Sequence, residues 1–199
     1  MLSFWSDSIK SMKSDACTMK RVIKSQEKDI DKLEQYSRRE NVKIYGLIEE
    51  ENENTDERVI KLFNDIGVEF DVNDISVSHR IGKISRNNDD TRPRPLIVKL
   101  LRRNKKTEIM KNKKRLKDKP HYKNVYINDD LTQLRAKIIA ELRKDDAIKQ
   151  VWTIDGKIFC IQMNGDKETK RIIESPDDLY RLGWSKETVK DKGLGGFDL

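Results

Sequence analysis

The segment Val42-Lys43-Ile44-Tyr45-Gly46-Leu47 alternates apolar and polar side chains and is rich in β-branched residues, as in a half-buried strand. An acidic run from Glu49 to Glu57 follows, and a helix is expected to begin within it at Thr55. Gly67 is the expected C-terminal stop of this helix, whose apolar residues recur at helical spacing: Val59, Leu62, Phe63 and Ile66. A strand, an acidic loop and a helix therefore open the globular part of the chain.

The same kinds of pattern continue downstream. A lysine-rich helix is expected at about Asn104–Lys117, and strands are expected at Ile75–Ile81, Leu96–Leu101 and Asn124–Ile127. Together with the first unit they give the order β-α-β-β-α-β over residues 42–128. This order predicts the ferredoxin-like α+β arrangement shared by RNA-recognition motifs, with four strands in one sheet and two helices on one face.

Residues 129–183 are expected to form a second, smaller α/β domain. Asp130 or Thr132 caps a helix, a hairpin turns at Asp155-Gly156, and a short helix is expected at Asp177–Leu182. Residues 184–199 contain three glycines and are predicted to be a flexible tail.

Residues 1–41 are predicted to form a coiled-coil helix and a neck. Apolar residues fall in alternating steps of three and four from Leu2 to Leu33, and this stretch contains no Pro or Gly. Such a narrow seam favours another helix as partner, so the chain is expected to form homo-oligomers; the alternative is a long helix packed on the chain's own globular body. The residues expected in the oligomer interface are Ile9, Met12, Met19, Ile23, Ile30 and Leu33.

Positive charge is concentrated in one part of the sequence. Only 35% of residues are hydrophobic and 39% are charged, which excludes one large core and favours small domains with much solvated surface. The net charge is +7, but residues 76–125 alone hold 17 Lys or Arg against 4 Asp or Glu. A concentrated positive field suits a polyanion, either nucleic acid or an anionic membrane surface.

No pattern of catalytic or metal-binding residues stands out. Cys17 and Cys160 are far apart, and His79 and His121 are isolated from them, so no metal site or disulfide framework is expected. Without a phosphate-binding glycine loop, a nucleophile elbow or paired His and Cys ligands, we expect neither an enzyme nor a cofactor. No apolar run approaches the roughly 20 residues that span a bilayer, and the N-terminus is amphipathic. An intracellular protein with no membrane partner and no small-molecule substrate is therefore predicted.

Arginines outside the helices are the strongest candidates for nucleic-acid contact, because a guanidinium group binds phosphate through two hydrogen bonds and also stacks on bases. They are Arg38 and Arg39 in the neck, Arg80 at a strand end, and Arg92 and Arg94 on a loop stiffened by two prolines. For the further candidates in the basic segment, a merely solvated face is the alternative; these are Lys99, Arg102, Arg103, Lys113 and Lys114.

Tyr45 is the candidate for base stacking, although its neighbours leave open whether it faces ligand or core. The strand Leu96–Leu101 has no aromatic residue. Stacking is therefore expected to be sparse, and binding is expected to depend on phosphate contacts, with strong salt dependence and weak sequence preference.

Four blocks of sequence, in this order and spacing, resemble the first-open-reading-frame protein of LINE-type (non-LTR) retrotransposons. The resemblance covers about Leu33 to Gly183, and its blocks are Leu33–Leu47, His79–Gly82, Arg92–Lys99 and Val125–Thr132 with Arg135. It implies a coiled coil, a variant RNA-recognition domain and a C-terminal nucleic-acid-binding domain, acting as a trimer that coats the element's RNA and serves as a nucleic-acid chaperone. The RNA contacts that it implies are Arg38, Arg39, Arg80, Arg92, Arg94 and Arg135.

The chain departs from this family at Asp29-Ile30-Asp31-Lys32-Leu33-Glu34. The family's trimer pattern has Arg before the paired apolar residues and Glu after them, whereas here Asp29 would face a neighbour's Glu34, so trimer and dimer both stay open. The expected partners are single-stranded RNA and DNA, in a cytoplasmic ribonucleoprotein with the nucleus as a second expected location.

Two other functions compete with this one. A DNA-binding regulator with a dimerising coil needs a major-groove element and basic residues before its zipper, whereas here the basic residues follow the coil. A basic coiled-coil scaffold on a membrane needs an apolar face on the basic helix, and Ile109, Met110 and Leu116 are few for that purpose.

Overall fold

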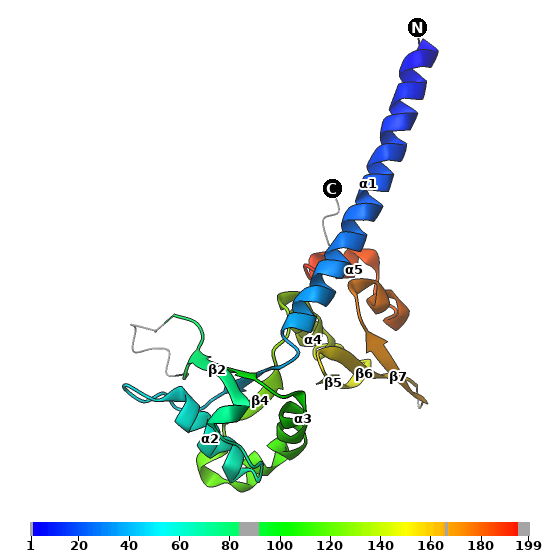
Figure 1. Cartoon of the computed structure of the whole chain (residues 1–199). Helices are drawn as coiled ribbons and strands as arrows, with labels where there is room; N and C mark the ends of the chain where they lie inside the picture. The colour runs from blue at the N-terminus through cyan, green and yellow to red at the C-terminus, as the bar shows by residue number, and fades with distance from the viewer. Residues whose placement is uncertain (1, 84–91, 166, 195–199) are drawn as a thin grey trace. The chain divides into compact units, whose positions relative to one another are not determined.

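The computed structural model describes residues 2–83, 92–165 and 167–194. The chain is α+β, as predicted, with a long N-terminal helix, a four-stranded antiparallel sheet and a three-stranded sheet (Figure 1). It divides into two compact units, Ser37–Asp130 and Met1–Tyr36 with Leu131–Leu199. In the described ranges no helix is long and apolar enough to cross a membrane.

The unit Ser37–Asp130 contains the four-stranded sheet, in the order β2-β3-β1-β4, and every neighbouring pair of strands is antiparallel. Its strands are β1 (Asn41–Tyr45), β2 (Ile75–Arg80), β3 (Leu96–Leu100) and β4 (Tyr126–Asp129). Its α-helices are α2 (Thr55–Asp65) and α3 (Arg103–Asn112), and its 3-10 helices are η1 (Val72–Asp74), η2 (Lys113–Asp118) and η3 (Pro120–Tyr122).

Both α-helices of this unit cover the same face of the sheet. Alternate strand residues are buried in one core with side chains of α2 and α3, and this core includes Val42, Ile44, Leu96, Val98, Ile127, Val59, Leu62, Phe63 and Ile109. Successive strand residues point to opposite faces, so the residues between the buried ones, such as Lys43 and Lys99, point away from the two helices. One face of the sheet is packed with apolar contacts, and the other carries polar side chains.

The acidic loop after β1 ends in the cap of α2. The Asn54 side chain accepts hydrogen bonds from the backbone amides of Asp56 (3.1 Å) and Glu57 (3.4 Å), and both acidic residues lie in the first turn, where the helix dipole favours negative charge. At the start of the loop, Gly46 has φ +77°, and a Cβ atom there would lie 1.9 Å from the carbonyl oxygen of Asn124. The chain therefore leaves β1 through a turn that fits only glycine.

Two predicted elements differ from the structure. The predicted helix Asn104–Lys117 is instead α3 followed by η2, whose tighter winding brings Leu116 into the core at 3% exposure. The predicted strand Asn124–Ile127 begins two residues later, because β4 pairs with β1 only from Tyr126 to Asp129 and the Asn124 carbonyl packs beside Gly46.

The other unit contains α1 (Leu2–Ser37), α4 (Gln133–Leu142) and three antiparallel strands, β5 (Ile148–Ile154), β6 (Lys157–Asn164) and β7 (Lys167–Ile173). The predicted hairpin is confirmed: Ile154 pairs with Lys157, and Asp155 (φ 51°) and Gly156 (φ 77°) have the two positive φ angles of a tight hairpin turn. Strand β7 has no counterpart among the sequence-based predictions.

The prediction of a flexible tail from residue 184 is wrong in its first part. After the 3-10 helix η4 (Pro176–Leu182), Ser185 caps α5 (Lys186–Asp191) by accepting a hydrogen bond from the Thr188 amide at 3.0 Å. Val189 and Leu194 are each 1% exposed and belong to the core of this unit, so the chain is folded as far as residue 194. The glycines at 195 and 196 lie outside the described residues.

Helix α1 is docked on its own unit at its C-terminal end. Every described side chain from Trp5 to Gln26 is exposed, whereas Asp31 and Gln35 are buried. The Thr132 hydroxyl donates to the Asp31 carboxylate (2.5 Å), and the Thr132 amide donates to the Gln35 side-chain oxygen (3.1 Å). The hairpin turn packs on the same helical turn, because a Cβ atom on Gly156 would lie 2.6 Å from the Gln35 amide carbon. The last turns of α1 are thus fixed against α4 and the β5–β6 turn.

Candidate nucleic-acid interface

The face of the four-stranded sheet that α2 and α3 leave uncovered carries side chains in three cross-strand rows, and we call it the open sheet face. The rows follow from the strand register, which sets residues of neighbouring strands directly opposite one another. They are Val77 with Lys99 and Asn41, then His79 with Ile97, Lys43 and Asn128, then Tyr45 with Tyr126.

Two tyrosines lie side by side on the open sheet face. Tyr45 on β1 pairs directly with Tyr126 on β4, and their exposed fractions are 38% and 58%. The sequence left the direction of Tyr45 undecided, and the burial of Val42 and Ile44 settles it, because Tyr45 is out of phase with both. Tyr126 was missed by the sequence analysis, although its alternation with buried Val125 and Ile127 signals an outward position. Two exposed rings on neighbouring strands suit the stacking of unpaired bases.

Two lysines lie in the other two rows of the open sheet face. Lys99 is exposed on β3, between Val77 and Asn41, as expected for a phosphate contact. Lys43 lies on β1, and its ammonium group is 2.7 Å from the Asp130 carboxylate, with the side chain 18% exposed. Lys43 was not among the predicted contacts. Lys43 is therefore in the row next to the tyrosine pair, with its ammonium group held at Asp130, and Lys99 is in the row farthest from the pair.

Asp130, directly after β4, contacts several polar side chains. It accepts hydrogen bonds from Arg38 (3.0 Å) and Asn41 (2.9 Å) and pairs with Lys43. Burial by itself raises the pKa of the Asp130 carboxyl, but the hydrogen bonds from Asn41 and Lys43 and the nearby charges of Lys43 and Arg38 outweigh it and lower the pKa. Asp130 is therefore a carboxylate at neutral pH that holds Arg38 at the edge of the sheet. Arg39, the second predicted neck residue, pairs with Glu40 at 3.2 Å.

The N-terminus of α3 adds two exposed arginines, Arg102 and Arg103. This helix has no acidic residue in its first turn and no side-chain cap. The positive charges of Arg102 and Arg103 add to the positive end of the helix dipole. This end of α3 therefore attracts anions more strongly than an ordinary helix N-terminus. Both predicted contacts are thus accessible.

The two lysines predicted on the basic helix differ in their surroundings. Lys114 is exposed. Lys113 donates a hydrogen bond to the Ile127 carbonyl (3.1 Å), and burial lowers its pKa, an effect that the charge of Asp129 opposes. Lys113 therefore connects η2 to β4 through a hydrogen bond. Of the two lysines, Lys114 is the more accessible to a phosphate.

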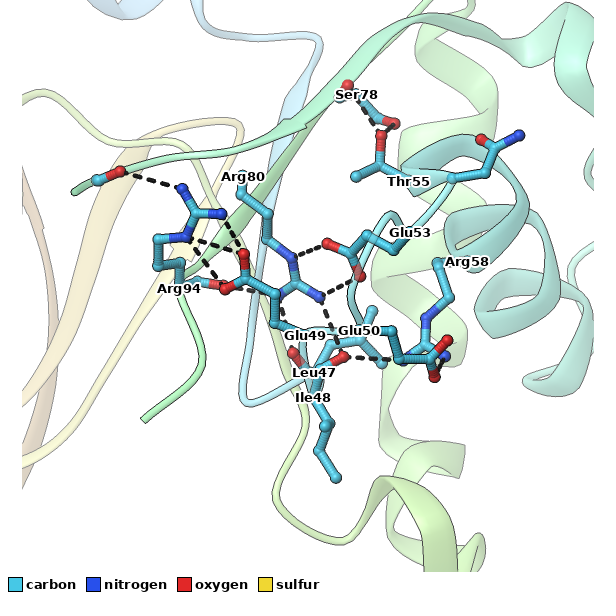
Figure 2. A network of polar contacts seen from close by, with 12 residues as sticks. Leu47, Ile48, Glu49, Glu50, Glu53, Thr55, Arg58, Ser78, Arg80 and Arg94 are labelled. Atoms are coloured by element: carbon cyan, nitrogen blue, oxygen red, sulfur yellow. Dashed lines mark hydrogen bonds and ion pairs between the residues drawn. The ribbon is translucent and has the colours of Figure 1, made fainter. Parts of the chain in front are cut away.

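Arg80 is the centre of a polar network in the loop between β1 and α2 (Figure 2). Its side chain is only 4% exposed and forms a two-pronged ion pair with Glu53, at 2.6 and 2.9 Å. It also donates to three backbone carbonyls, those of Leu47 (2.8 Å), Ile48 (3.2 Å) and Arg94 (2.7 Å). The hydrogen bonds from Arg80 lower the pKa of Glu53, so this pair is ionised at neutral pH. In this arrangement Arg80 holds the loop together and is turned away from solvent.

The two arginines around Pro93 also differ. Arg92 is exposed. Arg94 is 23% exposed, and its Nε atom is 3.1 Å from both carboxylate oxygens of Glu49, while Nη2 makes a short contact with Oε1 of the same group (Figure 2). No local sequence pattern indicates this pairing, because Glu49 and Arg94 are 45 positions apart.

Arg135 lies in the other unit and is also used internally. Its Nε atom donates to Asp31 of α1 at 2.9 Å, its Nη1 atom donates to the Gly156 carbonyl at 2.8 Å, and its side chain is 10% exposed. The structure therefore does not bring Arg135 into the exposed group. That group consists of Tyr45, Arg92, Lys99, Arg102, Arg103 and Lys114.

A second aromatic surface lies on the three-stranded sheet and was missed by the sequence analysis. Trp152 on β5 and Phe159 on β6 stack with ring centroids 5.7 Å apart and planes 14° from parallel. The Lys170 ammonium group on β7 lies 5.4 and 5.0 Å from the two centroids. Rings beside a cation on one face are groups of the kind that suit base stacking and phosphate contact.

The predicted oligomer residues are all exposed along α1; they are Ile9, Met12, Met19, Ile23, Ile30 and Leu33. The residues that dock α1 on its own unit, Asp31 and Gln35, lie on a different face of the helix from Ile30 and Leu33. Intramolecular docking therefore leaves the seam uncovered.

No protein-family model matches the chain, and no curated protein matches it either. Among the described residues, no group of three or more His, Cys, Asp or Glu side chains could hold a metal ion.

Proposed function

We propose that this chain is a self-associating protein that binds single-stranded nucleic acid, coats RNA in a retrotransposon ribonucleoprotein and acts there as a nucleic-acid chaperone. The observation that carries the proposal is the tyrosine pair, Tyr45 and Tyr126, on a sheet face that α2 and α3 leave uncovered and that also carries Lys43 and Lys99 in its other two rows. Exposed rings supply base stacking, and ammonium groups on the same face supply phosphate contacts. An unpaired strand uses both kinds of contact.

The arrangement of the unit Ser37–Asp130 supports an RNA-recognition type of domain. Its elements follow the order β-α-β-β-α-β, the strands lie in the order β2-β3-β1-β4, and both helices lie on one face. These features support a ferredoxin-like arrangement of the kind that RNA-recognition motifs share, and in those motifs the sheet carries the aromatic residues that stack on bases. The blocks that resemble the retrotransposon protein surround this face.

The proposed binding mode is mainly electrostatic. Bases stack on the tyrosines, while phosphates contact cations whose positions are exposed: Arg92, Lys99, Arg102, Arg103 and Lys114. Such contacts are individually weak and do not distinguish bases, so strands exchange on the surface. Weak, exchangeable contacts are what a protein needs to rearrange base-paired strands.

Self-association through α1 multiplies these contacts. Copies joined by their helices bring several open sheet faces to one RNA, and each additional contact then forms within the same complex at a high effective concentration. A strand is thereby retained even though each site is weak. The proposed setting is the cytoplasm, with the nucleus as a second location.

Binding to single-stranded RNA is expected to fall by about fiftyfold between roughly 50 and 200 mM salt, which corresponds to about four phosphate contacts on a single strand. Fluorescence anisotropy with an oligouridylate and a mixed-sequence RNA of about 20 nucleotides measures this, and the two RNAs should bind within about threefold of each other. Undetectable binding at low salt, or stronger binding to a DNA duplex of the same length, would contradict the proposed function and favour a scaffold or a DNA-binding regulator instead.

Replacing Tyr45→Leu together with Tyr126→Leu is expected to weaken RNA binding about tenfold, since one stacked base is worth about 1 to 3 kcal/mol. The slope of log affinity against log salt should stay unchanged, because no phosphate contact is removed. The matched control is Tyr180→Leu, which removes another partly exposed tyrosine, 36% exposed, from the other unit. If the control and the double variant bind RNA equally well, the open sheet face is not the stacking surface.

A further inference from the structure

The loop between β1 and α2 presents one carboxylate, Glu49, to a candidate RNA-contacting arginine, Arg94 (Figure 2). A guanidinium group that binds a carboxylate through two oxygens uses the same donors with which it would bind a phosphate. The hydrogen bond from Arg94 lowers the pKa of Glu49, an effect that burial opposes, so this competitor is negatively charged at neutral pH.

We infer that Glu49 is an internal competitor for phosphate: it occupies Arg94 until a phosphate of an already anchored strand displaces it, and it thereby sets the affinity of this contact. The inference rests on the proposed function and names a regulating residue of the same site. It makes Arg94 a contact formed in exchange for an existing ion pair.

The competitor is held in place by the backbone around it. Arg80 donates to the carbonyls of Leu47 and Ile48, which directly precede Glu49, and also to the carbonyl of Arg94. One buried guanidinium group therefore fixes both partners of the Glu49–Arg94 pair relative to each other. A group tethered in this way competes at an effective concentration in the millimolar range.

The exposure of the two ion pairs shows which of them is exchangeable. In the Arg80–Glu53 pair the side chains are 4% and 7% exposed, and exchange would leave two buried charges unpaired, which is strongly disfavoured. In the Arg94–Glu49 pair they are 23% and 32% exposed, so either charge can be taken over by water or by another ion. Glu53 keeps the loop folded, and Glu49 is the carboxylate that a phosphate can displace.

A free nucleotide and a strand meet this competitor differently. A free phosphate would contact Arg94 alone. It comes from bulk solution and has to displace a carboxylate that is tethered beside Arg94. A strand already bound at exposed cations such as Arg92 and Lys99 delivers its next phosphate at an effective concentration similar to that of Glu49. Arg94 is thereby reserved for a continuous polyanion.

The test compares Glu49→Gln with Glu50→Gln. Both remove one negative charge from the same loop and one arginine ion pair, since Glu50 pairs with Arg58, which is not a candidate contact. Glu49→Gln is expected to raise the affinity for an oligouridylate of about 20 nucleotides about fivefold, and Glu50→Gln is expected to change it by less than about twofold. Uridine monophosphate should also compete more strongly for the protein in Glu49→Gln, and by a larger factor than the strand gains, because no anchored contacts deliver its phosphate to Arg94.

Salt dependence gives a second readout that a purely structural role of Glu49 would not change. In the wild type the displaced Glu49 carboxylate takes up a cation from solution, which offsets the cation released by the phosphate. In Glu49→Gln no carboxylate is freed, so the released cation is not offset. The slope of log affinity against log salt should therefore steepen by about 0.7 in Glu49→Gln and stay constant in Glu50→Gln. In an Arg94→Gln background the gain from Glu49→Gln should disappear.

Equal affinities and equal slopes for the two glutamine variants would overturn the inference while leaving the proposed function intact. A gain from Glu49→Gln that persists without Arg94 would overturn it as well. Absence of RNA binding by the wild type and by all variants would contradict the proposed function itself. If Glu49→Gln does not fold, Glu49→Asp keeps the charge but shortens the reach to Arg94, and it should show a gain in the same direction.

Discussion

Ile23→Asp combined with Ile30→Asp is expected to convert the self-associated protein into monomers of 23.4 kDa. Both side chains lie on the exposed seam of α1, at 43% and 63% exposure. In a coiled coil they would be buried against a second copy, and two carboxylates there would be desolvated without partners. Size-exclusion chromatography with light scattering measures the mass, which for the wild type should be two or three times that of one chain.

The matched control is Ser11→Asp with Thr18→Asp, which adds the same charge at the same spacing of seven on exposed positions outside the seam. This control should keep the wild-type mass. A double seam variant that also keeps it would mean that α1 does not join copies of the chain. A wild type that is already monomeric would lead to the same conclusion.

Arg135→Ala is expected to destabilise the unit Met1–Tyr36 with Leu131–Leu199 by about 3 to 5 kcal/mol, because it leaves the buried Asp31 carboxylate without its cation. The guanidinium group also donates to the Gly156 carbonyl, so its loss leaves the hairpin turn with one unsatisfied acceptor. Denaturant unfolding followed by circular dichroism measures the change. The control Arg143→Ala removes an exposed arginine from the C-terminal end of the same helix and should cost less than about 0.5 kcal/mol.

The resemblance to the retrotransposon protein implies an RNA contact for Arg135, and a double variant separates the two roles. Asp31→Leu with Arg135→Leu replaces the ion pair by apolar side chains and should recover most of the stability lost in Arg135→Ala. If RNA binding returns together with stability, the role of Arg135 in binding is structural. If Arg135→Ala keeps its stability and loses RNA affinity, the buried ion pair is not what makes this residue important.

Local pattern was sufficient for most of the fold. The strands β1 and β2 were predictable from the alternation of apolar and polar residues, and β3 from its short apolar run. The hairpin was predictable because Asp155-Gly156 suits a turn with positive φ angles. Strand β7 was not predicted because most of its residues are charged and few are apolar, so no strand pattern is visible; the charged residues are Lys167, Glu168, Lys170 and Arg171. Helix α5 was missed behind the glycines, although Ser185 followed by Glu187 in the first turn is a helix-start signal.

The sequence predicted which residue types make up the candidate site. It did not predict which arginine forms an ion pair with which carboxylate. From residue type and sequence position, Arg80 and Arg94 were equally good candidates for RNA contact. In the structure Arg80 is buried and paired with Glu53, and Arg94 is paired with Glu49. The alternation of β2 gave a hint, because Arg80 shares a strand face with Ser78, which bonds to α2, and not with the exposed His79. The identity of an ion-pair partner 27 or 45 residues away depends on tertiary structure, and no local pattern carries it.

The docking of α1 through Asp31 and Gln35, on a face that does not include its seam, places two independent constraints on one helix. Along its whole length, substitutions are limited by whatever the seam faces. In its last turns they are limited also by Thr132, Arg135 and the hairpin turn, whose glycine leaves no room beside Gln35. If copies associate through the seam as proposed, substitutions in the first part of α1 change how copies pair and leave the globular unit intact. Substitutions near Asp31 would destabilise that unit itself.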